Sequence, residues 1–272
     1  MSHIPAERCL EIIELLAEDA ASMPLSEISE RLSLPKSGAH RMLATLVDLG
    51  WAEQDSETSY YRLTMRLAIL GQRFYVATGL PDMCQPVLDK LARACGEFAR
   101  LAVVDSQGLV WVAQAQGSLG GLLYQPSLNT NIVPLHRTAA GKAWLATLPT
   151  DAAMKRVLQF KFDDAGRYGP NAVQNIEAFM RELKATAKRG YGLAVNEAEP
   201  GVTAVALPIV PGEGMPAVGT VSIAGPSVRI PDARQLEIAQ QVLAAAQELA
   251  KLWPTRIQHR SPRADIHSRT TA

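Results

Sequence analysis

A short segment near the N-terminus, residues 36–45, carries side chains of the kind that bind phosphate and read nucleic-acid bases. It reads KSGAHRMLAT. Lysine and arginine neutralise phosphates, and arginine also reads guanine through paired N–H donors. At helical spacing, Ala39, Leu43 and Leu46 fall on one face and leave the polar side chains outward. The candidate DNA-contacting residues are Lys36, Ser37, Gly38, His40, Arg41 and Thr45.

The same positions also fit a plain solvated face on a three-helix domain. Gly38 weakens a helix by about 1 kcal/mol relative to alanine, although it also permits close approach to DNA. The whole chain has 27 basic and 27 acidic side chains, and residues 1–76 hold 7 basic against 11 acidic ones. Because this segment has no excess of positive charge, any DNA affinity must come from a few locally placed basic side chains. Dimerisation would be needed to double their number.

A second segment, residues 138–141, combines small side chains with the start of a predicted helix. It reads Thr-Ala-Ala-Gly. Small side chains leave backbone N–H groups open at a helix N-terminus, which suits an anion such as a carboxylate. The alternative is that Gly141 and the alanines only allow close packing of the helix.

The sequence offers no catalytic or metal-binding constellation. There is no Gly-x-Ser-x-Gly motif, and the cysteines, Cys9, Cys84 and Cys95, lie far apart without zinc-type spacing or a placed histidine partner. His136 is a lone histidine, so we expect no metal and no cofactor. Without a signal peptide or a long apolar run, we expect a reduced, cytoplasmic protein with no membrane partner.

The elements that would position residues 36–45 form a compact N-terminal unit. Apolar periodicity predicts helices over 6–19, 25–32 and 36–49, with a tight Ser-Leu-Pro turn before the third helix. Residues 51–53 and 60–63 read as a short β-hairpin with an acidic tip. Three helices followed by a hairpin are typical of a winged helix-turn-helix.

The rest of the chain predicts an α+β unit. Helices are expected over 64–78, 82–95, 138–148, 151–160, 171–189 and 231–252, and strands over 98–105, 109–114, 202–210 and 216–224. We divide the chain into a winged helix-turn-helix (1–63), a linker helix (64–79), a larger α+β domain (80–253) and a disordered tail (254–272). Leu119, Leu122 and Tyr124 follow a glycine-rich segment and are expected to form an apolar lid or plain core.

The sequence resembles the IclR family of bacterial regulators from about residue 5 to 252. The N-terminal match comprises residues 8–13, 25–29, 34–43 and 61–63; the C-terminal match comprises PLHRTAAGKA at 134–143, RGY at 189–191, EAEPGV at 197–202 and SIAGP at 222–226. The resemblance implies a winged helix-turn-helix, a dimerising linker helix and a GAF-like effector domain. It further implies a homodimer or homotetramer that binds a double-stranded DNA operator.

The resemblance also implies a small-molecule effector, an organic acid or aromatic catabolite, and we expect it to bear a carboxylate. The family's pocket positions correspond to Ala139, Ala140, Ala204, Ser222 and Ala224. Ser222 is the one hydroxyl among them, and we expect it to bond the ligand or to be a satisfied core hydroxyl. Glu197 is expected to gate the pocket or to bond the neighbouring loop.

The sequence departs from the family pattern at three positions. Gly38 stands where threonine is common, Thr64 where glycine is common and Ala204 where cysteine is frequent. Ala204 indicates either a less polar ligand or a weaker polar anchor. Two other functions stay open at this point. One is an enzyme with an accessory winged helix, and the other is a regulator whose C-terminal unit only assembles the oligomer.

Overall fold

The computed structural model describes residues 4–18, 22–106, 108–117, 123–126, 132–158, 162 and 168–253. The chain divides into two compact units, residues 1–77 and 78–272. Among the described helices, none is long and apolar enough to cross a membrane. The predicted lid residues Leu119 and Leu122, and the predicted tail 254–272, lie outside the described residues.

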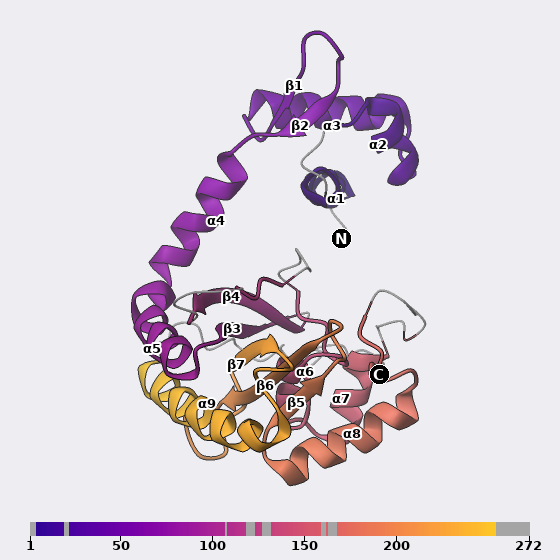
Figure 1. Cartoon of the computed structure of the whole chain (residues 1–272). Helices are drawn as coiled ribbons and strands as arrows, with labels where there is room; N and C mark the ends of the chain where they lie inside the picture. The colour runs from indigo at the N-terminus through magenta and orange to yellow at the C-terminus, as the bar shows by residue number, and fades with distance from the viewer. Residues whose placement is uncertain are drawn as a thin grey trace, which may run out of the picture. The chain divides into compact units, whose positions relative to one another are not determined.

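The first unit is a winged helix-turn-helix followed by one further helix (Figure 1). It contains α1 (Ile4–Glu18), α2 (Leu25–Arg31), α3 (Lys36–Asp48), the hairpin β1 (Ala52–Gln54) and β2 (Tyr61–Leu63), and α4 (Arg66–Ala77). The core that joins α1, α2 and α3 to the hairpin includes Ile12, Ile28, Leu43 and Tyr61. Burying these apolar side chains fixes the polar face of α3 outward.

The second unit is built on one antiparallel sheet with strand order β4-β3-β7-β6-β5. The strands are β3 (Phe98–Asp105), β4 (Gly108–Gln116), β5 (Gly192–Val195), β6 (Val202–Ile209) and β7 (Gly219–Pro226). Their register sets Arg100 of β3 opposite Ser222 of β7, and Ala204 of β6 opposite Ala224. Because facing residues on neighbouring strands share a face of the sheet, these four line one surface.

Helices cover both faces of this sheet (Figure 1). On one face lie α5 (Leu80–Cys95) and α9 (Asp232–Leu252), and on the other lie α6 (Ala139–Leu145), α7 (Thr150–Val157) and α8 (Ile176–Arg189). The apolar core on the α6 side includes Ala143, Trp144, Phe179 and Ala206. The prediction of an α+β chain that begins with a winged helix-turn-helix is confirmed.

Two element predictions need correction, and one strand was missed. The helix predicted over 171–189 begins only at Ile176, because the Asn175 side chain caps it by accepting a hydrogen bond from the Ala178 N–H. The strand predicted over 216–224 is shifted to Gly219–Pro226 by its pairing with β6. Strand β5 was not predicted, since four residues at a sheet edge carry too short a pattern to be recognised.

Candidate functional site

Helix α3 is fixed in orientation by its buried apolar face and by a hydrogen bond at its C-terminal end. Ala39, Leu43 and Leu46 are buried. The Arg66 guanidinium donates a hydrogen bond to the Leu49 carbonyl and lies 4.9 Å from the centre of the Trp51 ring. These contacts join the end of α3 to the start of α4.

The predicted DNA-contacting residues gather on this one face. Lys36, Ser37, His40, Arg41 and Thr45 are exposed, and Gly38 is half-buried. The Thr45 hydroxyl donates to the Arg41 carbonyl (3.0 Å). Within the described part of the chain, neither Lys36 nor Arg41 forms an ion pair. Both cations are therefore available to an external anion.

The hairpin offers a different electrostatic surface. Arg62 is neutralised by Glu53 at 2.6 Å. At the tip, hydrogen bonds from the backbone and side chain of Thr58 hold the pKa of Asp55 below its usual range. The tip therefore stays negatively charged near neutral pH and is a poor phosphate contact, as its sequence predicts.

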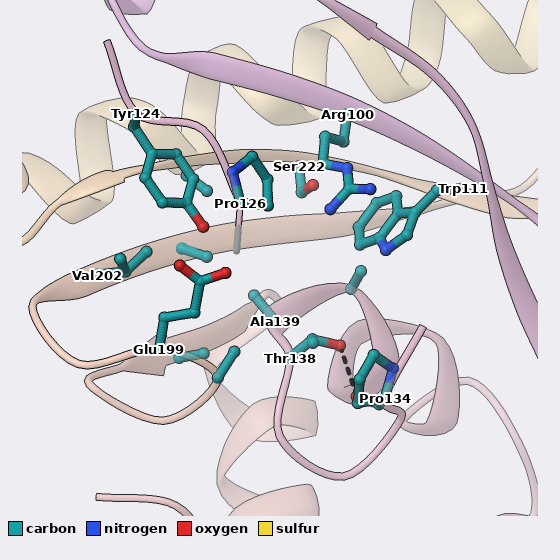
Figure 2. A pocket seen from close by; sticks show the side chains of 15 residues that line it. Arg100, Trp111, Tyr124, Pro126, Pro134, Thr138, Ala139, Glu199, Val202 and Ser222 are labelled. Carbon is teal, nitrogen blue, oxygen red and sulfur yellow. Dashed lines mark hydrogen bonds between the residues drawn. The ribbon is translucent and has the colours of Figure 1, made fainter. Parts of the chain in front are cut away.

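In the second unit, a small cavity of about 70 Å³, partly open to solvent, lies between the sheet and the start of α6 (Figure 2). Its lining comprises Arg100, Trp111, Tyr124, Pro126, Pro134, Thr138, Ala139, Ala140, Ala194, Ala198, Glu199, Val202, Ala204, Ser222 and Ala224. All five positions implied by the family resemblance line this cavity, and so does Tyr124. Their small side chains leave the space between the sheet and α6 open.

An arginine that the sequence reasoning missed dominates one end of the cavity. The Arg100 guanidinium lies 3.9 Å from the centre of the Trp111 ring and 5.9 Å from that of Phe98. Burial lowers its pKa to about 10, so it remains a cation at neutral pH. Its Nε is buried, and no described residue accepts a hydrogen bond from it. A half-buried cation with an unused donor, held against an aromatic face, is suited to a carboxylate.

Tyr124 and Glu199 lie together in another part of the cavity (Figure 2). The Tyr124 hydroxyl donates a hydrogen bond to the Glu199 carboxylate, and burial raises the pKa of that hydroxyl. The Tyr124 ring also packs edge-on against Phe98, with ring centres 5.9 Å apart. Tyr124 is therefore not only an apolar wall but also a holder of the Glu199 carboxylate.

A buried lysine, Lys142, fixes the loop that carries Glu199. The Lys142 side chain is fully buried, and its Nζ lies 2.6 Å from Glu197 Oε1, 2.8 Å from the Leu193 carbonyl and 3.4 Å from Glu182 Oε1. Burial raises the pKa of Glu197, and Lys142 opposes that rise. Glu197 does not line the cavity; it ties residues 196–201 to α6.

The start of α6 offers fewer open N–H groups than the sequence suggests. The Thr138 hydroxyl accepts a hydrogen bond from the Gly141 N–H at 3.0 Å, and its own O–H donates to the Pro134 carbonyl at 2.9 Å. A Cβ added to Gly141 would lie 2.2 Å from the Leu135 carbonyl oxygen. Gly141 is therefore required for close backbone packing.

His136 also has a structural environment. Its Nε2 accepts a hydrogen bond from Arg137 Nε at 2.6 Å, and burial lowers its pKa to about 4, so the imidazole is neutral at pH 7. Among the described residues, no cluster of His, Cys, Asp or Glu could hold a metal ion.

Two of the missed site residues, Arg100 and Glu199, had a weak signal in the sequence. Arg100 is the one charge in the middle of the otherwise apolar strand FARLAVV, residues 98–104. Glu199 lies in the motif EAEPGV, residues 197–202, two positions after Glu197. Nothing in the sequence by itself shows that Trp111 lies near Arg100 or Glu199, because that proximity depends on how the strands pair.

The fold and the two sites define a class of protein: a transcription regulator with a winged helix-turn-helix and a separate ligand-sensing unit. Two family models match the chain, "IclR helix-turn-helix domain" over residues 5–56 and "Bacterial transcriptional regulator IclR C-terminal" over 73–251. The chain therefore belongs to the IclR family of bacterial transcription regulators, which are not enzymes.

Curated relatives agree with this assignment. The chain is 31% identical over 246 residues to the HTH-type transcriptional regulator BhcR of Paracoccus denitrificans, covering 90% of this chain and 85% of the relative. It is 28% identical over 242 residues to the transcriptional repressor IclR of Escherichia coli, covering 89% and 87%.

Solved structures share the fold. An IclR-family regulator from Brucella abortus matches with a TM-score of 0.73 at 22% identity, covering 92% of each chain. An IclR homologue from Microbacterium hydrocarbonoxydans, complexed with 4-hydroxybenzoate, matches with a TM-score of 0.72 at 23% identity, covering 92% of this chain and 98% of the other.

Proposed function

We propose that a carboxylate-bearing small molecule binds in the cavity beside Arg100 and thereby changes the affinity of this regulator for its DNA operator. The observation that carries the proposal is Arg100 itself: a half-buried cation over Trp111 whose Nε has no hydrogen-bond partner among the described residues. An unsatisfied buried donor is unfavourable until a ligand satisfies it. A bound carboxylate would accept from the guanidinium and restore that hydrogen bond.

Further features of the cavity support an organic acid. Ala139, Ala140, Ala204 and Ala224 give an apolar wall, and Ser222 adds a buried hydroxyl on the strand position facing Arg100. This combination suits a ligand with an apolar body and one anionic end. The structural neighbour complexed with 4-hydroxybenzoate is an example of such a ligand in this fold.

The exposed face of α3 is the proposed DNA-reading surface. Lys36 and Arg41 would neutralise phosphates or read guanine, and Ser37, His40 and Thr45 would add polar contacts in the major groove. Gly38 has no side chain to keep DNA away from the backbone of α3. A Cβ added there would meet only the Met42 methyl, at 4.0 Å. We assign residues 1–63 to DNA reading and 80–253 to effector binding.

We further propose that residues 64–79 pair two copies of the chain. Helix α4 buries none of its own residues, and Ile69, Leu70, Phe74 and Val76 are exposed. Apolar side chains exposed along a whole helix favour association. A homodimer or homotetramer would place two α3 helices for successive major grooves, about 34 Å apart, and a ligand would act by changing that spacing.

The test measures binding to DNA from upstream of the gene by fluorescence anisotropy, with and without 4-hydroxybenzoate as the first probe. We expect the probe to shift the DNA affinity of the wild type and not that of Arg100→Gln. Arg156→Gln is the matched control, because Arg156 also lies over a tryptophan, Trp144, but outside the cavity. An equal response of wild type and Arg100→Gln would contradict the anchoring role of Arg100. Specific DNA binding that no carboxylate alters would instead favour a C-terminal unit that only assembles the oligomer.

A further inference from the structure

The cavity contains one cation and one carboxylate, contributed by different strands and loops. Arg100 comes from β3, and Glu199 from the loop between β5 and β6. Glu199 is close enough for its charge to act on Arg100. Figure 2 shows Arg100 beside Trp111 and Ser222, and Glu199 beside Tyr124. The formal charges of the two side chains cancel, but the two groups lie in different parts of the cavity. Arg100 attracts an anionic group of a ligand, and Glu199 attracts a hydrogen-bond donor.

Glu199 is held in place rather than left to turn away. Two residues earlier, Glu197 is bound to the buried Lys142, and its carbonyl accepts from the Gly169 N–H at 2.9 Å. Within the same loop, Asn196 Oδ1 accepts from the Gly201 N–H at 2.6 Å. The Tyr124 hydroxyl then holds the Glu199 carboxylate itself. A carboxylate has two oxygens and about four acceptor sites, so it can accept from a ligand as well as from Tyr124.

This arrangement discriminates among organic acids. A ligand carboxylate gains from Arg100, but a second carboxylate near Glu199 would meet a like charge in a partly desolvated site, which is unfavourable. A hydroxyl or ammonium group in that position would instead donate to Glu199. Discrimination by a misplaced charge is a common source of specificity.

We propose that the cavity selects monocarboxylates that carry a hydrogen-bond donor at the end away from the carboxylate, and that Glu199 rejects dicarboxylates. This inference rests on the proposed function, since it specifies which acids occupy the site anchored by Arg100. Arg100 and Trp111 bind the carboxylate end of the ligand. Glu199, held by Tyr124, accepts a hydrogen bond from the donor at the other end.

The experiment compares acids of one skeleton that differ only at the far end. The aromatic set is 4-hydroxybenzoate, benzoate and terephthalate, and the aliphatic set is 4-hydroxybutanoate, butanoate and succinate. Isothermal titration calorimetry on the full chain would measure each affinity for the wild type, for Glu199→Gln and for Glu213→Gln. The last variant makes the same change of charge at an exposed turn outside the cavity.

For the wild type, in at least one set, we expect the hydroxy acid to bind most tightly and the dicarboxylate at least about tenfold more weakly than the hydroxy acid. Glu199→Gln should reduce that ratio by about tenfold, mainly by strengthening dicarboxylate binding, and Glu213→Gln should leave it unchanged. A dicarboxylate that binds the wild type as tightly as the hydroxy acid would overturn the inference. So would a ratio that Glu199→Gln does not change, or the absence of binding by all six acids at millimolar concentration.

The DNA-binding assay separates this inference from the proposed function on which it rests. If the acids bind in the expected order but none alters DNA affinity, the selectivity stands and effector control fails. If both sets alter DNA affinity through Arg100 without regard to the far end, effector control stands and the selectivity fails.

Discussion

Replacing Lys142 by methionine should strongly destabilise the second unit. The Nζ of this side chain contacts Glu197, the Leu193 carbonyl and Glu182 while its exposed fraction is 0%. Methionine has a similar length but neither charge nor donors. The change therefore leaves the Glu197 carboxylate, itself only 12% exposed, without its nearest cation.

The expected loss is about 3–5 kcal/mol, the usual result of removing one partner from a buried ion pair. This is a large part of the roughly 5–15 kcal/mol that stabilises a typical domain. Replacing Glu197 by methionine as well removes the stranded charge, so the double variant should recover most of the loss. A similar loss in both variants would mean that packing, and not charge, determines the effect.

The loss should depend on pH. Burial already raises the pKa of Glu197 above its ordinary value of 4.5, and Lys142 opposes that rise, so Lys142→Met must raise the pKa further. A carboxyl group with a raised pKa in the folded state destabilises the fold above that pKa and ceases to do so as the group protonates. The difference between variant and wild type should therefore shrink from pH 7 towards about pH 5.

Urea denaturation followed by tryptophan fluorescence would measure the effect. Trp51 is the only tryptophan in the first unit, so a Trp51→Phe background makes emission report on the second unit alone. Lys90→Met is the matched control, because Lys90 forms an exposed ion pair with Glu248 and should have little effect. A destabilisation of Lys142→Met no larger than that of Lys90→Met would refute the reasoning.

Three further predictions concern α3 and α6. Arg41→Ala should weaken DNA binding and reduce its salt dependence by about one counterion, measured by anisotropy at several salt concentrations. Arg93→Ala, an exposed position on α5 in the second unit, should do neither, and equal effects would argue against α3 as the DNA-reading helix. Gly38→Ala should raise the stability of the first unit by up to about 1 kcal/mol in thermal unfolding, since the added Cβ meets no atom closer than 4.0 Å. Gly141→Ala should instead lower the melting temperature of the second unit, because its Cβ would lie 2.2 Å from a backbone oxygen; a stable variant would show that the start of α6 can move.

Local patterns were sufficient to predict the helix-turn-helix and most of the elements. Ala39, Leu43 and Leu46 recur at helical spacing, so the buried face of α3 and its exposed polar face follow from the sequence. The helix predicted from residue 171 failed at its start, because a side-chain cap at Asn175 ends the extended segment there. Such a cap is a local hydrogen bond that apolar periodicity does not report.

The cavity could be predicted only in part. Its small residues came from family resemblance, and each of the five lies in the lining. Residue-by-residue reasoning left Glu197 either as a gate or as a bond to the neighbouring loop, and the structure buries it against Lys142. It also missed Arg100 and Glu199, because a single charged residue in a strand or loop has no meaning until its neighbours in space are known.

The sequence by itself determined which faces of the helices are apolar, where α3 begins, and that small residues cluster near residues 139–141. These properties depend on neighbours three or four positions away along the chain, so local physical chemistry is enough to reveal them. Only the tertiary structure decided that Arg100, Trp111, Tyr124 and Glu199 share one cavity (Figure 2). They lie up to 99 positions apart, and it is the pairing of β3 with β4 and β7, and of β7 with β6, that brings an arginine to one side of a small space and a carboxylate to the other.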